Sequence, residues 1–173
     1  MNYKRLNPAI IHLETVDSTN NYAANLLKTS KITNGTVIVT KGQTAGKGQR
    51  GNSWESEDEK NIILSIILFP EIQPKDSFYL TIAASLAVHK TISLHLNNVK
   101  IKWPNDILVG QKKIAGILIE NQIKSSLIIS SIIGIGINVN QENFNSGMQA
   151  TSFKSELNQD FNLQNLLNEL YLN

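Results

Sequence analysis

The chain has 173 residues, of which 41% are hydrophobic and 17% charged, and its formal net charge is +2. A chain of this length fits one domain and can bury about two-thirds of the surface that its unfolded form exposes. The composition is that of a folded globular protein and excludes a disordered or fibrous one. The net charge is too small to indicate a broad basic face that binds nucleic acid, so any anion site must be local.

Cysteine is absent, which excludes disulfides and thiolate metal sites. The three histidines, His12, His89 and His95, stand singly in the sequence, and we interpret them as structural or surface residues rather than metal ligands. The first residues carry charges without a long apolar core, and the longest apolar run, at 127–139, is too short to span a membrane. We therefore expect a cytoplasmic protein without a membrane partner.

The sequence of the first half of the chain predicts strands and a helix in alternation. A short strand at 10–13 leads into a helix. Either Asp17 or Ser18 can cap this helix by accepting hydrogen bonds from its first amides. Two strands rich in β-branched residues follow, at 35–41 and 61–69, with a glycine-rich loop between them.

The second half predicts a long helix and then a β-meander. Apolar residues recur at helical spacing within residues 77–96. Residues 99–122 contain two extended segments, with a turn at 110–112, and the run at 127–139 is a buried strand. A last helix is indicated by one apolar stripe, formed by Leu163, Leu166, Leu167 and Leu170. Together these elements predict an α+β fold in one domain over residues 1–173, with a mixed, largely antiparallel sheet packed with helices.

The segment QTAGKGQRGNSW predicts an anion-binding loop. Lys47 and Arg50 supply positive charge, and Trp54 follows, either to stack on a base or to anchor the core. The spacing of a P-loop is missing, and the GxGxxG pattern leads into an acidic loop instead of a helix, which excludes a dinucleotide fingerprint. A solvated hairpin loop is the alternative. The glycines expected to adopt positive φ and to approach a ligand closely are Gly46, Gly48 and Gly51.

A second polar cluster lies in IKWPNDILVGQKKIAGILIE. Strand alternation places Lys102, Asn105 and Asp106 near one rim. Further along, the small residues that end at Gly116 leave room for a ligand if Lys113 points inward. Ordinary turn formers and a solvated lysine are the alternatives.

These motifs, together with VDSTN at 16–20 and GIGINV at 134–139, resemble those of biotin protein ligases and occur in the same order. The glycine-rich loop is similar to GRGRxGxxW, KWPND matches the family motif, and KIAGILIE is similar to K[LI]AGIL[VI]E. The resemblance implies a catalytic domain like those of class II aminoacyl-tRNA synthetases and biotin protein ligases. It implies that ATP and biotin, with Mg²⁺, form biotinyl-5′-AMP, which then biotinylates a lysine of a biotin carboxyl carrier protein.

The resemblance also implies roles for individual residues. The expected catalytic residues are Lys113, Lys47 and Asp106, the last also as a metal ligand. Those expected to bind biotin are Ser18, Thr19, Asn20, Gln43, Lys47, Gly48, Gln49, Lys113 and Gly116. Those expected around the nucleotide are Gly46, Arg50, Trp54, Asn105 and Asn138.

The sequence departs from the family pattern in the loop and at its ends. Lys47 and Gln49 stand where the family usually has arginines, so the loop loses a bidentate fork and one charge. Two alternatives stay open: the loop retains the adenylate less well, or Arg50 compensates. We expect no N-terminal helix-turn-helix, hence no nucleic acid partner, and no small C-terminal β-barrel. A non-catalytic module for biotin or carrier binding, and a ligase for another acyl acid such as lipoate, stay open. So does a homodimer formed through an exposed sheet edge.

Overall fold

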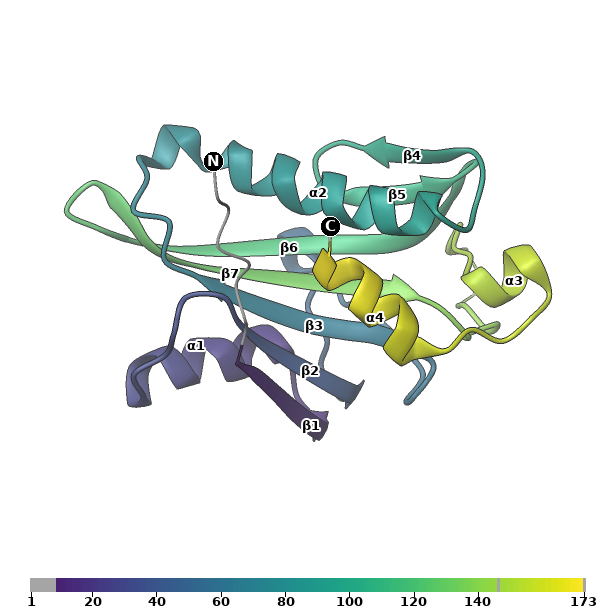
Figure 1. Cartoon of the computed structure of the whole chain (residues 1–173), viewed down its shortest axis with the longest axis horizontal. Helices are drawn as coiled ribbons and strands as arrows, with labels where there is room; N and C mark the ends of the chain where they lie inside the picture. The colour runs from purple at the N-terminus through teal and green to yellow at the C-terminus, as the bar shows by residue number, and fades with distance from the viewer. Residues whose placement is uncertain (1–8, 146, 173) are drawn as a thin grey trace.

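The computed structural model describes residues 9–145 and 147–172. Its regular elements alternate between strands and helices in the first half and run mainly as strands in the second (Figure 1). In chain order they are β1 (Ile10–Val16), α1 (Thr19–Thr29), β2 (Thr36–Gln43), β3 (Asn61–Leu68), α2 (Phe78–Ser93), β4 (Val99–Lys102), β5 (Asp106–Val109), β6 (Lys112–Lys124), β7 (Leu127–Asn138), α3 (Phe153–Leu157) and α4 (Leu163–Leu172).

The strands form one seven-stranded sheet in the order β1-β2-β3-β7-β6-β5-β4. Strands β1 and β2 are parallel, which requires the crossover that α1 provides, and every other neighbouring pair is antiparallel. Strands β4 to β7 are neighbours both in sequence and in the sheet, as expected for a meander. The predicted α+β fold with a mixed, largely antiparallel sheet is confirmed.

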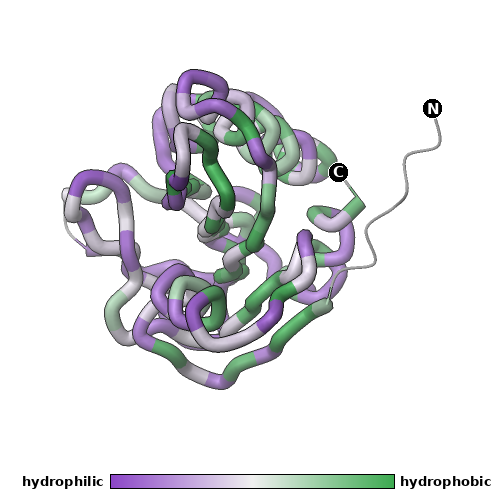
Figure 2. Tube along the Cα trace, turned by 90° about the vertical axis from the view of Figure 1, so that its left-hand side faces the viewer, coloured by the Kyte–Doolittle hydropathy of each residue, from purple (hydrophilic) through white to green (hydrophobic). Residues whose placement is uncertain are grey.

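Helices cover both faces of this sheet: α2 and α4 lie on one face and α1 on the other (Figure 1). Val88 and Ile92 of α2 are fully buried in the larger core, and burial of each side chain contributes roughly 1.5–3 kcal/mol. A smaller core packs Ala23 of α1 against Ile38 and Ile67 of the sheet. Hydrophobic and hydrophilic residues accordingly alternate along much of the trace (Figure 2). None of the helices in the described residues is long and apolar enough to cross a membrane.

The structure differs from the expected elements in three places, two of which follow from strand pairing. Strand β1 continues to Val16 because its register with β2 extends to the pair Val16 and Gln43. The two extended segments expected at 99–122 are three strands, β4, β5 and β6, and β6 runs to Lys124 because β7 pairs with it along its length. Helix α3 was not predicted from the sequence. It is a short helix whose N-cap, Ser152, accepts a hydrogen bond from the Ser155 amide at 3.1 Å.

Candidate active site

A narrow pocket of about 40 Å³ lies on the α1 face of the sheet. The start of α1, the end of β2 and the glycine-rich loop form one side of it, and strands β3, β6 and β7 form the other. Its lining residues are Ser18, Thr19, Asn20, Gln43, Lys47, Gly48, Gln49, Trp54, Ile63, Leu64, Asn105, Lys113, Gly116, Ile117, Leu118, Gly134, Ile135 and Gly136. Segments that lie far apart in the sequence therefore meet at one site.

The floor of the pocket is a pair of glycines, Gly116 of β6 and Gly136 of β7, which are register partners. The indole of Trp54 rests on them: a Cβ at Gly136 would lie 2.4 Å from Trp54 Cε2, and one at Gly116 would lie 3.0 Å from Cζ3. The buried Trp54 Nε1 has no hydrogen-bond partner among the described residues. The room that the sequence suggested beside Gly116 is thus filled by Trp54 itself, which explains the small volume.

The glycine-rich loop is a closed hairpin rather than a flexible connection. The Trp54 amide donates to the Gly46 carbonyl at 2.9 Å. Of its three glycines only Gly51 has a positive φ, of 82°, so the expectation of positive φ at Gly46 and Gly48 is wrong. Gly46 is instead required by close approach, because a Cβ there would lie 2.4 Å from the carbonyl oxygen of Trp54.

The first amide of α1 points at the pocket and is capped from β2. The Thr19 amide donates to Gln43 Oε1 at 2.7 Å, and the Thr19 hydroxyl donates to the same oxygen at 3.2 Å. Ser18 occupies the N-cap position, but its side chain makes no capping hydrogen bond, so the prediction of a cap from Ser18 is wrong. Because the Gln43 oxygen is engaged by α1, its NH₂ group is left to donate to a ligand.

Asp17, the other predicted cap, lies outside the pocket wall. Its carboxylate accepts a hydrogen bond from Asn21 Nδ2 at 2.6 Å. This hydrogen bond, followed by one from the Ser18 amide, lowers the pKa of Asp17, and the charge of Lys47 adds to the same effect. The group therefore stays ionised beside the loop.

Two residues that the sequence analysis did not select hold the start of α1 in place. The hydroxyl of Ser65, which is fully buried, lies 2.8 Å from Thr19 Oγ1 and 2.6 Å from Asn20 Oδ1. Asn20 Nδ2 in turn donates to Glu120 Oε2 at 2.7 Å. Both ends of the Asn20 amide are thus used within the protein. Ser65 was visible as the polar residue in the middle of the apolar run IILSIILF, and Glu120 as a carboxylate on the same face of β6 as Gly116.

Each lysine of the pocket has a carboxylate partner. Lys113 Nζ lies 2.7 Å from Asp106 Oδ1 and 5.5 Å from the centre of the Trp54 ring, which is within the range of a cation–π contact. Lys47 Nζ lies 3.9 Å from Glu120 Oε1, a looser ion pair. Lys113 is therefore held at the glycine floor, with its charge compensated by a carboxylate that is itself half-buried.

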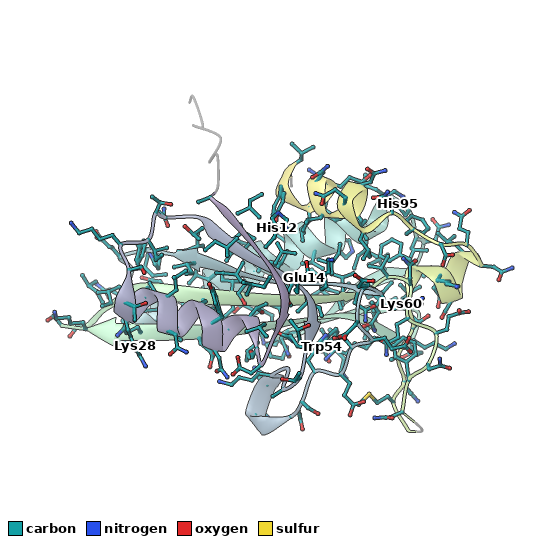
Figure 3. All side chains as sticks on the ribbon, turned by 90° about the horizontal axis from the view of Figure 1, so that it is seen from below. His12, Glu14, Lys28, Trp54, Lys60 and His95 are labelled. Carbon is teal, nitrogen blue, oxygen red and sulfur yellow. The ribbon has the colours of Figure 1, made fainter. Side chains whose placement is uncertain are left out.

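These donors do not form a site for a resident metal ion. Asp106, the expected ligand, is engaged by Lys113, and within the described residues no group of three or more His, Asp or Glu side chains could hold an ion. The histidines have other surroundings: His95 lies 2.6 Å from Glu169, and Figure 3 shows His12 and His95 apart from each other. A Mg²⁺ ion in this pocket would need most of its oxygen ligands from phosphates and water.

The structure brings together all the residues that were predicted to bind biotin, because each of them lines the pocket. Of the predicted nucleotide residues, Trp54 and Asn105 also line it. Gly46, Arg50 and Asn138 do not: Arg50 is exposed, and the buried Asn138 side chain donates to the Thr151 carbonyl at 3.0 Å. Their contacts with a nucleotide stay predictions.

Solved structures of biotin protein ligases share this fold. The enzyme from Aquifex aeolicus in complex with biotin and ATP superposes with a TM-score of 0.77 at 28% identity, over 95% of this chain and 67% of that one. The enzyme from Leishmania major in complex with biotinyl-5-AMP gives a TM-score of 0.79 at 26% identity, over 96% and 73%. The fold is thus that of the biotin protein ligase class.

The chain belongs to the Biotin/lipoate A/B protein ligase family, whose profile matches residues 12–138. Among curated relatives, the bifunctional ligase/repressor BirA of Bacillus spizizenii is 40% identical over 134 residues, which cover 77% of this chain and 41% of that protein. The biotin–[acetyl-CoA-carboxylase] ligase of Paracoccus denitrificans is 31% identical over 131 residues, covering 73% and 53%. The chain thus spans about half or less of the length of these relatives.

Proposed function

We propose that this chain is the adenylating part of an ATP-dependent biotin protein ligase, a biotin–[biotin carboxyl carrier protein] ligase. The observation that carries the proposal is the position of Lys113, which is held by Asp106 at the glycine floor, opposite the closed loop and beside the start of α1. The curated relatives named as biotin ligases support the proposal. So do the solved structures of two similar enzymes, one in complex with biotin and ATP and the other with biotinyl-5-AMP.

In this proposal the start of α1 recognises the head of biotin. The urea group of biotin has one carbonyl acceptor and two N–H donors. The NH₂ group of Gln43 supplies a donor in a fixed orientation, and the hydroxyls of Ser18 and Thr19 lie on the same wall. Apolar side chains such as Ile63 and Leu118 complete the pocket, as in most small-molecule sites.

The first step joins biotin to AMP. A carboxylate oxygen of biotin bonds to the α-phosphorus of ATP, the bond from that phosphorus to the oxygen bridging to the β-phosphorus breaks, and pyrophosphate leaves. Lys113, with Lys47 on the facing loop, stabilises the negative charge that gathers on the α-phosphate oxygens. Trp54 is proposed to flank the adenine, and Asn105 to lie beside the nucleotide. Mg²⁺ is proposed to enter as a complex with the phosphates of ATP.

The second step transfers biotin. The amine of an acceptor lysine attacks the acyl carbon of the adenylate, AMP leaves, and the amine loses a proton. We propose that the acceptor is the biotin carboxyl carrier domain of a biotin-dependent carboxylase in the cytoplasm. The edge strands of the sheet, β1 and β4, are the proposed surfaces for a homodimer.

The test mixes the protein with ATP, Mg²⁺ and labelled biotin, lipoate or octanoate, with and without a carrier domain. We expect pyrophosphate release that depends on biotin, followed by labelling of the carrier. Turnover with lipoate or octanoate alone would show a ligase for another acyl acid. Biotin binding without pyrophosphate release would show a non-catalytic module, for which the uncharged Gln49 in the loop is the feature in favour.

A further inference from the structure

Lys47 of the glycine-rich loop lies between two cavities. It lines the pocket described above, and it also lines a second cavity of about 260 Å³ between α1 and the outer parts of β6 and β7. Glu120 lines the second cavity and is absent from the wall of the first. The ammonium group of Lys47 therefore has its present partner on the side of α1, outside the ligand pocket.

Glu120 connects two elements through its two carboxylate oxygens. Oε2 accepts a hydrogen bond from Asn20 Nδ2 at 2.7 Å, and Oε1 lies 3.9 Å from Lys47 Nζ. The first contact is anchored, because Asn20 Oδ1 is held by the buried hydroxyl of Ser65 at 2.6 Å. The second is loose, and the two side chains are 44% and 42% exposed. Such a pair is weak and can exchange for another partner at little cost.

We propose that Glu120 is a positioning residue which holds Lys47 on the α1 side of the pocket until the carboxylate of the ligand replaces it. The inference rests on the proposed function, because the ligand must be a carboxylate that reaches the loop. The flexible four-carbon stem of lysine lets the ammonium move between the two anions while the backbone of the loop stays closed. Glu120 thereby sets how strongly the pocket prefers a charged ligand over a neutral one of the same shape.

A physical consequence separates this role from a general effect of charge. If Glu120 competes for Lys47, removal of its charge strengthens the binding of an anion only while Lys47 is present. If Glu120 acts through its field alone, removal of its charge strengthens anion binding with or without Lys47. If the pair only supports the structure, neither change depends on the charge of the ligand.

The experiment measures dissociation constants by calorimetry for biotin and for its neutral methyl ester. The variants are Glu120→Gln, Lys47→Met and the double variant. Glu120→Gln keeps an oxygen that accepts from Asn20, so the start of α1 stays anchored. Asp76→Asn is the matched control, since it removes one carboxylate before α2, the helix on the opposite face of the sheet (Figure 1).

We expect Glu120→Gln to lower the dissociation constant for biotin about 2- to 5-fold and to leave that for the methyl ester unchanged, as suits a weak exposed pair. In the Lys47→Met background the same change should have no effect on biotin. An equal gain in that background, or equal shifts for both ligands, would overturn the inference. If the wild-type protein binds biotin but the variants show either of these results, the inference fails alone; if the wild-type protein does not bind biotin, the proposed function fails and the inference with it.

Discussion

Replacement of Lys113 by methionine tests the centre of the proposed site. The substitution leaves Asp106 Oδ1 buried without the ammonium group that lies 2.7 Å away. Removing one member of a fully buried ion pair costs about 3–5 kcal/mol. The Lys113 side chain is 34% exposed, so solvent screening reduces the expected loss in the free energy of unfolding to about 1–2 kcal/mol. Loss of the positive charge at the α-phosphate should lower adenylation about 10²- to 10³-fold.

The double variant Lys113→Met with Asp106→Asn separates the two effects, because it removes both charges. Urea unfolding should show that most of the lost stability returns, while biotin-dependent pyrophosphate release stays at the level of the single variant. Near-normal release by either variant would refute the assignment of Lys113 to the reaction. A double variant that is no more stable than Lys113→Met would refute the assignment of Asp106 as its counter-ion.

Three further changes test other parts of the structure. Ser65→Ala removes the buried hydroxyl that holds the start of α1, and should cost roughly 1–2 kcal/mol in urea unfolding and weaken biotin binding; unchanged binding would speak against the network. Gln49→Arg restores a cation to the pocket wall and should slow release of labelled adenylate about 5- to 10-fold when no acceptor is present; equal release rates would remove the loop from adenylate retention. Burial raises the pKa of Tyr171 to about 12. Its contribution to stability is therefore complete below about pH 10 and is lost as pH rises towards 12, by no more than about 1–2 kcal/mol after solvent screening. Tyr171→Phe should unfold with a smaller loss over that interval, and an equal loss would contradict the assignment.

The sequence was informative where a feature depends on neighbours along the chain. The β-branched run at 127–139 and the helical spacing within 77–96 predicted β7 and α2 to within a few residues, because strand and helix geometry impose their own periodicity on burial. The glycine-rich loop was also recognisable, although the positive φ expected at Gly46 and Gly48 was wrong. Gly46 makes room for the carbonyl of Trp54 eight residues later, and no local rule of backbone conformation shows such a contact.

The sequence thus determined the α+β class, the order of the motifs and the polar residues that line the pocket. Only the tertiary structure decided which of them touch one another. Ser65 reaches Thr19 across 46 positions, and Asn20 reaches Glu120 across 100, because β3, β7 and β6 lie side by side beneath the start of α1. Likewise Trp54 occupies the glycine floor, and Lys47 pairs with Glu120. Such contacts depend on strand order and register, which arise from packing of the whole chain, whereas periodicity and turn chemistry act only over a few residues.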